Sequence, residues 1–332
     1  MSTSGGTRAI IAALLANLGI ALTKFVAYLI THSSSMLAES VHSVADSGNQ
    51  ALLLLGGKRA QRGASPEHPF GYGRDRYIYA FIVSIVLFSV GGLFALWEGF
   101  QKLGHPHPID SAWVAIGVLL VAIALESFSF RTAIVESNRV RGRISWVNFI
   151  RRAKAPELPV VLLEDFGALI GLVFALIGVS LAVLTGDSVW DAIGTLAIGA
   201  LLVAIAIVLA IETKSLLIGE AATQADLKRI EAALLAEPEV RSIIHMRTMH
   251  LGPEELLVAV KVAVDGASSA ADLAAAIDRA EARVRAAVPI ARIIYIEPDI
   301  RRASAEPAPV WSADQRRTPA PEPASEPATG PG

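Results

Sequence analysis

The sequence predicts an α-helical membrane protein with six transmembrane helices, followed by a small cytoplasmic α+β domain. Hydrophobic residues make up 53% of its 332 residues and charged residues only 18%, so the chain is more apolar than an ordinary soluble domain. Apolar runs long enough to cross a bilayer occur six times before residue 215. After that residue the composition becomes that of a soluble protein.

The apolar runs predict membrane-spanning helices, because each reaches the length of about 20 residues that a crossing requires. The first run is too long for the apolar core of a cleavable signal peptide, and it leads directly into the second. Buried helices of a large soluble protein are the less favoured alternative, because so many runs follow one another. The predicted spans are residues 8–31, 34–56, 77–100, 110–131, 158–184 and 189–211.

Lysine and arginine in the connections predict the orientation of the spans. The connections 57–77 and 131–157 are rich in these residues, while the alternate connections contain Lys102 alone. Because positive charge accumulates in cytoplasmic loops, both termini are predicted to lie in the cytoplasm. We expect an integral, multi-pass protein of the plasma membrane with the lipid bilayer as its surroundings.

The segment after the last span has the periodicity of a compact α+β domain. Helical patterns cover 228–240 and 267–288, and strand patterns cover 241–251, 255–265 and 291–300. The order αββαβ, with a hairpin through Gly252-Pro253, predicts a ferredoxin-like or metallochaperone-like layer domain. A stretch rich in proline and alanine then predicts a disordered tail. The predicted domains are the transmembrane domain 1–214, the cytoplasmic domain 215–301 and the tail 302–332.

Composition also restricts the chemistry and the partners. The absence of cysteine excludes disulfides and thiolate ligands, so histidine and carboxylates are the strong metal ligands that remain. The 29 Lys+Arg nearly balance the 31 Asp+Glu, and aromatic residues amount to 6%. This balance argues against a nucleic-acid partner.

The second predicted span carries a candidate metal site. His42 and Asp46 lie four residues apart, so on a helix they project from one face, one turn apart. Glu39 and Asn49 lie three residues to either side and share that stripe. An imidazole nitrogen and a carboxylate oxygen supply half of a tetrahedral site for a divalent cation such as zinc. The alternative is a buried histidine–aspartate hydrogen bond that packs two helices together.

The fifth predicted span adds two adjacent carboxylates, Glu164 and Asp165. Adjacent helical residues point about 100° apart, so we expect one of them to aim at the centre that His42 and Asp46 define. The other is interpreted as a partner of a ligand, a proton acceptor or a residue that faces a neighbouring helix. Glu164 is also close enough to the basic side of the membrane to extend toward the interface. Other charged residues within the spans are interpreted as interhelical pairs or interfacial residues: Lys24, Glu98, Glu126 and Asp191.

These features together resemble the cation diffusion facilitators. The likeness rests on the six spans with the αββαβ domain, on SSSMLAESVHSVADSGNQ in the second span and on HPFGYGR before the third, and it covers about residues 8–300. It implies a homodimer that exports divalent cations from the cytoplasm in exchange for protons. The likeness assigns His42, Asp46 and Asp165 as transport ligands, the last supported by Gly171 six residues later.

The resemblance is incomplete at the fourth ligand. Most of the family has histidine at the position that Val161 occupies here. The chain instead resembles a subgroup of the family with HxxxD in the second span and ED in the fifth. Glu164, Asn49 or water is left to complete the site.

Two auxiliary metal sites that the resemblance implies are also incomplete. His68 stands at one ligand position of the loop after the second span, where Tyr72 and Ser65 replace the others. In the cytoplasmic domain, Glu297 is the one coordinating residue among the expected positions, and His245 and His250 are five apart on a strand, so they point to opposite faces. We therefore expect this domain to dimerise rather than to sense metal.

The sequence thus predicts a divalent metal cation transporter without a permanently bound cofactor. Zinc is the favoured cation, and cobalt or iron also suits histidine with carboxylates, whereas an oxygen-richer site with Glu164 or Asn49 would favour manganese or magnesium. A metal-responsive receptor or scaffold without transport is the alternative. An intramembrane metallohydrolase is disfavoured, because HxxxD lacks the neighbouring glutamate of an HExxH helix.

Overall fold

A computed structural model describes residues 3–105, 109, 111–264 and 269–300, with side chains from residue 17 onward. The chain divides into two compact units. The helical unit comprises Met1–Glu220 with His250–Glu254, and the sheet unit comprises Ala221–Met249 with Glu255–Gly332. The tail predicted for 302–332 lies outside the described residues.

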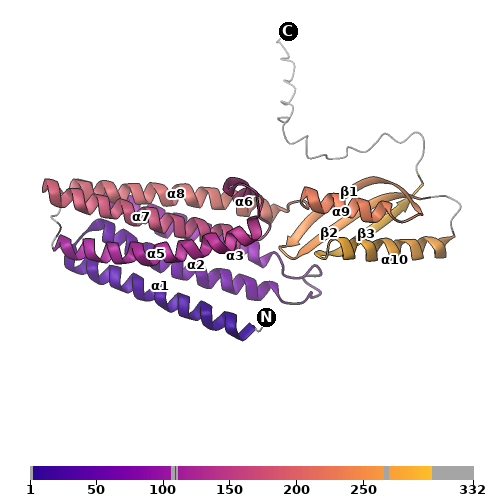
Figure 1. Ribbon diagram of the computed structural model, residues 1–332, viewed down its shortest axis with the longest axis horizontal. Helices are drawn as coiled ribbons and strands as arrows, with labels where there is room; N and C mark the ends of the chain where they lie inside the picture. The colour runs from indigo at the N-terminus through magenta and orange to yellow at the C-terminus, as the bar shows by residue number, and fades with distance from the viewer. Residues whose placement is uncertain (1–2, 106–108, 110, 265–268, 301–332) are drawn as a thin grey trace, which may run out of the picture. The chain divides into compact units, whose positions relative to one another are not determined.

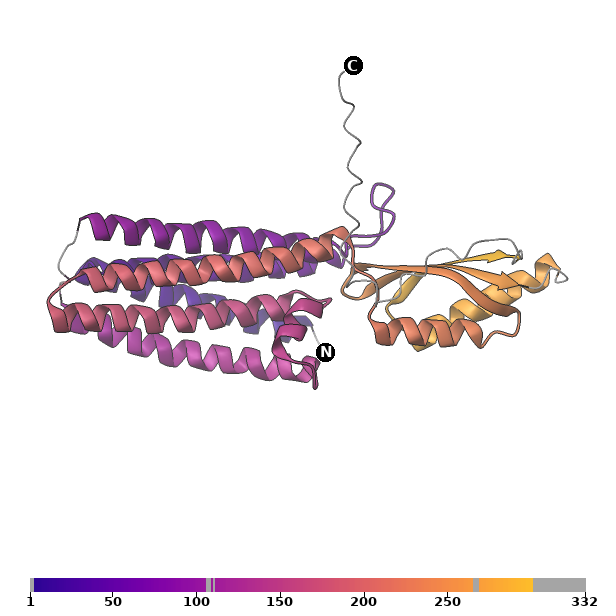
Figure 2. The same cartoon turned by 90° about the horizontal axis from the view of Figure 1, so that it is seen from above.

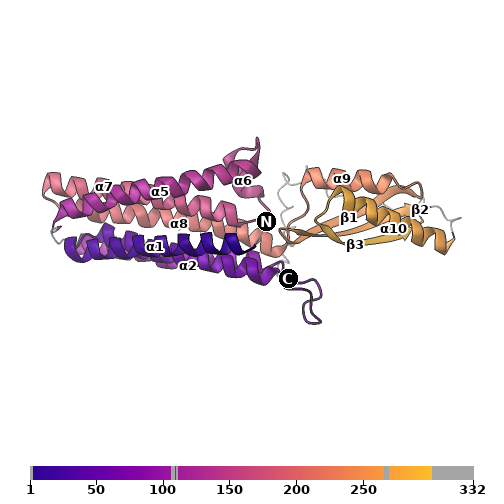
Figure 3. The ribbon, with the colours of Figure 1, turned by 60° about the horizontal axis from the view of Figure 1, so that its bottom comes forward.

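The helical unit is a bundle of long helices that run alongside one another (Figure 1). Helix α1 packs along α2, and α5 packs along α7 (Figure 3). Helix α7 also packs along α8, which contacts α4 and the π-helix η1. The elements are α1 Thr3–Thr31, α2 Ser34–Ala60, α3 Asp75–Val86, η1 Leu87–Leu93, α4 Phe94–Gly104, α5 Ala112–Arg141, α6 Trp146–Arg152, α7 Glu157–Thr185 and α8 Val189–Ile218.

Four helices of the described chain are long and apolar enough to cross a membrane. They are Asp75–Gly104, which joins α3, η1 and α4, then α5, α7 and α8, and they correspond to the third to sixth predicted spans. The described apolar part of α1 is shorter, Asn17–Thr31, and α2 carries polar residues along its length. Length and composition thus identify four helices that could cross a membrane, and the first two predicted crossings stay a proposal.

A buried carboxylate from α8 holds the N-terminus of α2. Asp191 accepts hydrogen bonds from Ser33 Oγ at 2.9 Å and from the backbone N–H of Ser34 at 2.9 Å. The first N–H groups of a helix have no partner within the helix, and the dipole favours negative charge there. Asp191 thus fixes the start of α2 against α8.

Glycine lets α7 and α8 approach closely. A Cβ atom at Gly178 would lie 2.9 Å from the carbonyl oxygen of Trp190, and a Cβ at Gly194 would lie 3.0 Å from that of Phe174. Any larger residue at these positions would push the helices apart, because small residues set the distance between helices in lipid. This contact fixes α7, which carries two of the candidate ligands, on α8.

The sheet unit has the predicted αββαβ order. Its elements are α9 Gln224–Leu235, β1 Val240–Gly252, β2 Glu255–Val264, α10 Ala270–Ala287 and β3 Ala291–Asp299. The sheet order is β1-β2-β3, and β2 pairs with β3 in parallel. Only two residues join the neighbouring strands β1 and β2, so these two form the antiparallel hairpin that was predicted.

Both helices of the sheet unit cover one face of its sheet (Figure 2). Helix α9 begins at Thr223, whose side chain accepts from the N–H of Asp226, and α10 begins at Ser269, which caps Asp272 in the same way. The core between helices and sheet is formed by aliphatic side chains, among them Ile230, Leu234, Val258, Val260, Val284 and Ile294.

Candidate metal centre

Helix α2 places His42 and Asp46 side by side, as their spacing predicts. Nε2 of His42 lies 3.5 Å from Oδ2 of Asp46, and the histidine side chain is only 1% exposed. Both ring nitrogens of His42 and Oδ1 of Asp46 have no hydrogen-bond partner among the described residues. Buried polar atoms normally have partners, so these atoms are suited to receive a cation that the protein does not itself supply.

The π-helix η1 faces the histidine. A Cβ atom at Gly91 would lie 3.7 Å from Nδ1 of His42, so the backbone of η1 passes close to the imidazole. Single π-helical turns within α-helices often occur at functional sites. Sequence periodicity did not predict η1, and the pair Gly91-Gly92 is the one local signal of an irregular helix at this point.

The α7 carboxylates face different neighbours. Oε1 of Glu164 accepts a hydrogen bond from Nδ2 of Asn49 on α2 at 2.6 Å. Oδ2 of Asp165 accepts one from Oγ of Ser129 on α5 at 2.9 Å. Their side chains diverge as expected for adjacent helical residues, yet both line one small pocket with Asp46.

That pocket lies between four helices of the bundle. Its wall includes Asp46 of α2 and the two α7 carboxylates, together with Glu126 of α5. His42 is not among the lining residues. The remaining lining residues are Asn17, Ile20, Ser43 and Gln50.

The candidate ligands are neighbours rather than a closed coordination shell. In the part of the chain that the structure describes, no three histidine, aspartate or glutamate side chains form a group able to hold a metal ion. His42 contacts Asp46, and Asp46 shares a pocket with Asp165. Binding of a metal by all of them would therefore require a rearrangement that brings these side chains onto one centre.

Comparison with known proteins places the chain in a family. Residues 10–218 match the cation efflux transmembrane domain, and residues 222–299 match the cytoplasmic domain of cation efflux proteins. The chain belongs to the cation efflux family. This confirms, at the level of the family, the resemblance noted in the sequence.

The relatives of this cation efflux protein include named metal transporters. It is 33% identical over 246 residues to the "Proton-coupled zinc antiporter SLC30A9, mitochondrial" of Xenopus laevis, covering 73% of this chain and 44% of that protein. It is 27% identical over 251 residues to the "Cation-efflux pump FieF" of Klebsiella pneumoniae, covering 76% and 79%. The chain thus spans less than half the length of the Xenopus relative.

The solved structures that part of this chain matches include a variant of the MamM C-terminal domain. The sequence identity is 23% and the TM-score 0.23, over 24% of this chain and 94% of that one.

Two charged residues of the cation efflux protein that sequence reasoning set aside lie at the site. Glu126 lines the pocket, and Lys24 donates from Nζ to Oε2 of Glu39 at 3.1 Å and to Oγ of Ser43 at 2.8 Å. Charged residues within a membrane span are costly and therefore functional candidates by default. From the sequence, that rule could mark Lys24 and Glu126 as candidates. Which of the charged residues lie near the pocket depends on how the helices pack.

The auxiliary positions are occupied by interactions of their own. The rings of His68 and Tyr72 lie 4.6 Å apart between centroids, and the Tyr72 hydroxyl lies 3.2 Å from that of Ser65. In the sheet unit, Nζ of Lys261 lies 3.0 Å from both Glu297 and Asp299, and hydrogen bonds to these two carboxylates raise the lysine pKa. Glu297 is thus engaged with a lysine of the neighbouring strand.

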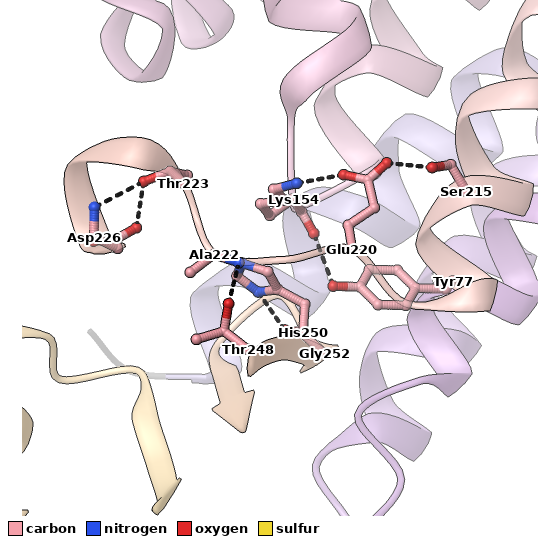
Figure 4. A network of polar contacts seen from close by, with 10 residues as sticks. All are labelled: Tyr77, Lys154, Ser215, Glu220, Ala222, Thr223, Asp226, Thr248, His250 and Gly252. Atoms are coloured by element: carbon pink, nitrogen blue, oxygen red, sulfur yellow. Dashed lines mark hydrogen bonds and ion pairs between the residues drawn. The ribbon is translucent and has the colours of Figure 1, made fainter. Parts of the chain in front are cut away.

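A polar network of the helical unit joins Tyr77, Lys154, Ser215 and Glu220 (Figure 4). Lys154, before α7, pairs with Glu220, which also accepts a hydrogen bond from Ser215 at 2.5 Å. The hydroxyl of Tyr77 donates to the carbonyl oxygen of Lys154 at 3.1 Å. Burial raises the pKa of the Glu220 carboxyl, but the hydrogen bonds from Lys154 and Ser215 and the lysine charge hold it below its usual value.

Proposed function

We propose that this protein exports divalent metal cations from the cytoplasm in exchange for protons. One observation carries the proposal: the buried His42 lies beside Asp46, both have unpartnered metal-binding atoms, and Asp46 shares a pocket with the α7 carboxylates. The relatives named as a zinc antiporter and a cation-efflux pump support the same activity.

The transport domain is proposed to cross the membrane six times, with both termini in the cytoplasm. Helices α1 and α2 have 29 and 27 residues, more than the length of about 20 that a crossing requires. The polar side chains of α2, including Glu39, His42 and Asn49, are buried inside the bundle, so lipid does not meet them. Hydropathy therefore understates the suitability of α2 for a membrane.

The proposed ligands are His42, Asp46 and Asp165, the pattern of the subgroup with HxxxD and ED. Glu164 is the candidate for a fourth ligand, and its bond to Asn49 makes that residue a partner that orients it. Histidine must be neutral and the carboxylates ionised to bind metal, so metal binding releases protons and proton binding releases metal. Rocking of helices around this site would expose it to each side in turn.

Zinc is the proposed cargo, because imidazole with carboxylates suits it and a relative is named as a zinc antiporter. Manganese, iron and cobalt are the competing cations. The working form is proposed to be a homodimer, since residues 222–299 match the cytoplasmic domain of the family. The plasma membrane is the proposed location, and because the Xenopus relative is named as mitochondrial, a fluorescent fusion in the source cell provides the test.

The deciding experiment is transport by the purified full chain in proteoliposomes. We expect radiolabelled zinc to accumulate in vesicles whose interior is more acidic than the outside solution. An internal pH dye should show protons leaving the vesicles as zinc enters. Asp46→Ala and Asp165→Ala should abolish both fluxes, whereas Asp187→Ala, at an exposed carboxylate outside the site, should retain them. Zinc binding without flux would instead indicate a metal-responsive receptor or scaffold.

A further inference from the structure

Lys24 is a buried lysine in the middle of the helical unit that the proposed transport cycle does not use. Its side chain is 1% exposed, although it lies on α1 within a predicted span. Leaving an ammonium group at such a place costs several kcal/mol unless it is paired. Its partners therefore define what the charge does.

Lys24 donates hydrogen bonds to two side chains of α2, both on the stripe that carries the site. Nζ lies 3.1 Å from Oε2 of Glu39 and 2.8 Å from Oγ of Ser43, which precede His42 and Asp46 by three residues each. Ser43 also lines the pocket that Asp46 lines. The ammonium group thus touches the wall of that pocket through a single hydroxyl.

The pocket has an excess of negative groups. Four carboxylates line it, Asp46, Glu126, Glu164 and Asp165, and its described lining residues include no lysine or arginine. Lys24 brings a positive charge within hydrogen-bond distance of Ser43, which lines the pocket, and Glu39 pairs with that charge. In a medium of low dielectric constant, such fixed charges act strongly on a divalent cation nearby.

We propose that Lys24 is a tethered counter-cation that, with Glu39, sets the affinity of the neighbouring site for divalent metal. This inference rests on the proposed function, because it takes Asp46 as a metal ligand. The lysine charge weakens metal binding and so favours release, while the Glu39 charge offsets it. Metal affinity is then adjusted by a charge pair that does not coordinate the metal.

Removing one or the other charge of the Lys24–Glu39 pair should shift the zinc affinity in opposite directions. Lys24→Met removes a positive charge and should tighten zinc binding by about tenfold, whereas Glu39→Gln leaves the lysine unbalanced and should weaken it by about tenfold. The double variant removes no net charge and should bind within about threefold of wild type. A pair that merely held α1 on α2 would weaken binding in both single variants and would not be restored in the double variant.

The experiment is a zinc titration by calorimetry on the full chain in detergent. Only the binding that disappears in Asp46→Ala is counted, so that surface histidines do not contribute. Lys24→Arg, which keeps the charge, should behave as wild type. Lys102→Met is the matched control, because Lys102 is a buried lysine that donates to the carbonyl of His32 at 3.2 Å instead of to a carboxylate near the site.

The outcomes separate the two levels of the proposal. Wild-type protein that binds zinc, with both single variants shifted in one direction or neither shifted, overturns the role of Lys24 and leaves the transport proposal standing. Wild-type protein with no Asp46-dependent zinc binding overturns both. Size-exclusion profiles check folding. If Lys24→Met does not fold, the weakening in Glu39→Gln and the restoration in the double variant decide the question.

Discussion

Asn49 on α2 donates a hydrogen bond from Nδ2 to Oε1 of Glu164 on α7, with 2.6 Å between the two atoms. Both side chains are buried, at 0% and 4% exposure. The bond joins the two helices that carry the proposed ligands and engages one oxygen of the glutamate. Asn49 therefore orients the Glu164 carboxylate at the proposed site rather than binding the metal itself.

Glu164→Gln should weaken zinc binding less than Asp46→Asn does, because Asn49 already engages one of the two Glu164 oxygens. Glutamine keeps an oxygen that accepts from Asn49, so we expect a loss of about tenfold, against more than about a hundredfold for Asp46→Asn. Calorimetric titration of the two variants in detergent measures both. Equal losses would contradict this ranking and show that Glu164 contributes to metal binding as much as Asp46 does.

His42→Asp should change which metal is preferred. Replacing the imidazole by a carboxylate gives a site made of oxygen atoms, which suits manganese better than zinc. Competition of zinc and manganese against a radiolabelled tracer in proteoliposomes gives the preference. Selectivity identical to that of wild type would remove His42 from the set of ligands.

Much of the fold could be predicted from the sequence, because membrane helices appear as long apolar runs and the strands and helices of the sheet unit as periodic apolar residues. The structure has helices at all the predicted spans, but α5 continues to Arg141 and α8 to Ile218, beyond the predicted 131 and 211. Hydropathy reports where the bilayer ends, and a helix continues into water as long as its backbone bonds are made. The π-helix η1 and the short helix α6 were not predicted, because neither has a distinct hydropathy pattern of its own.

The candidate site could be predicted within one helix but not between helices. The spacing of His42 and Asp46 fixes their geometry, because residues four apart share a helix face. The contacts of Lys24 with α2 and the place of Glu126 in the pocket depend on how neighbouring helices are rotated and shifted. A single sequence carries no measure of that packing.

Gly171→Ala should destabilise the helical unit through Glu39. A Cβ atom at 171 would lie 2.7 Å from Oε1 of Glu39, and that side chain is held on its other oxygen by Lys24. We expect a loss of about 1–3 kcal/mol, seen as a lower thermal midpoint in detergent. Gly48→Ala, on the same α2 as Glu39 and with nothing within 4 Å of its Cβ, should be neutral or slightly stabilising. Equal effects at both positions would contradict the contact.

Glu220→Gln should lower stability at neutral pH and matter less in acid. The pKa of Glu220 is below its usual value of 4.5 in the folded protein, so its ionised form stabilises the fold above that pH, and this contribution is lost as the pH falls through the folded pKa. The difference in thermal midpoint between wild type and variant should therefore be larger at pH 7 than at a pH below the usual glutamate pKa of 4.5. A difference that stays constant would contradict the role of the Lys154 pair. The exposed Glu231→Gln serves as control.

Asp191→Ala should be among the most destabilising single changes in the helical unit, although it lies outside the proposed site. The carboxylate accepts from Ser33 Oγ and from the N–H of Ser34, both buried, and the variant leaves these donors without an acceptor at the start of α2. An unsatisfied buried donor costs about 1–3 kcal/mol, so we expect a loss of about 2–4 kcal/mol together with reduced zinc affinity, because α2 carries His42 and Asp46. Asp187→Ala is the matched control, since Asp187 accepts from the N–H of Val189 at 3.0 Å on the exposed side of the same turn and should cost about 1 kcal/mol. Thermal unfolding in detergent compares the two, and equal losses would mean that the α2 cap contributes nothing beyond an ordinary surface cap.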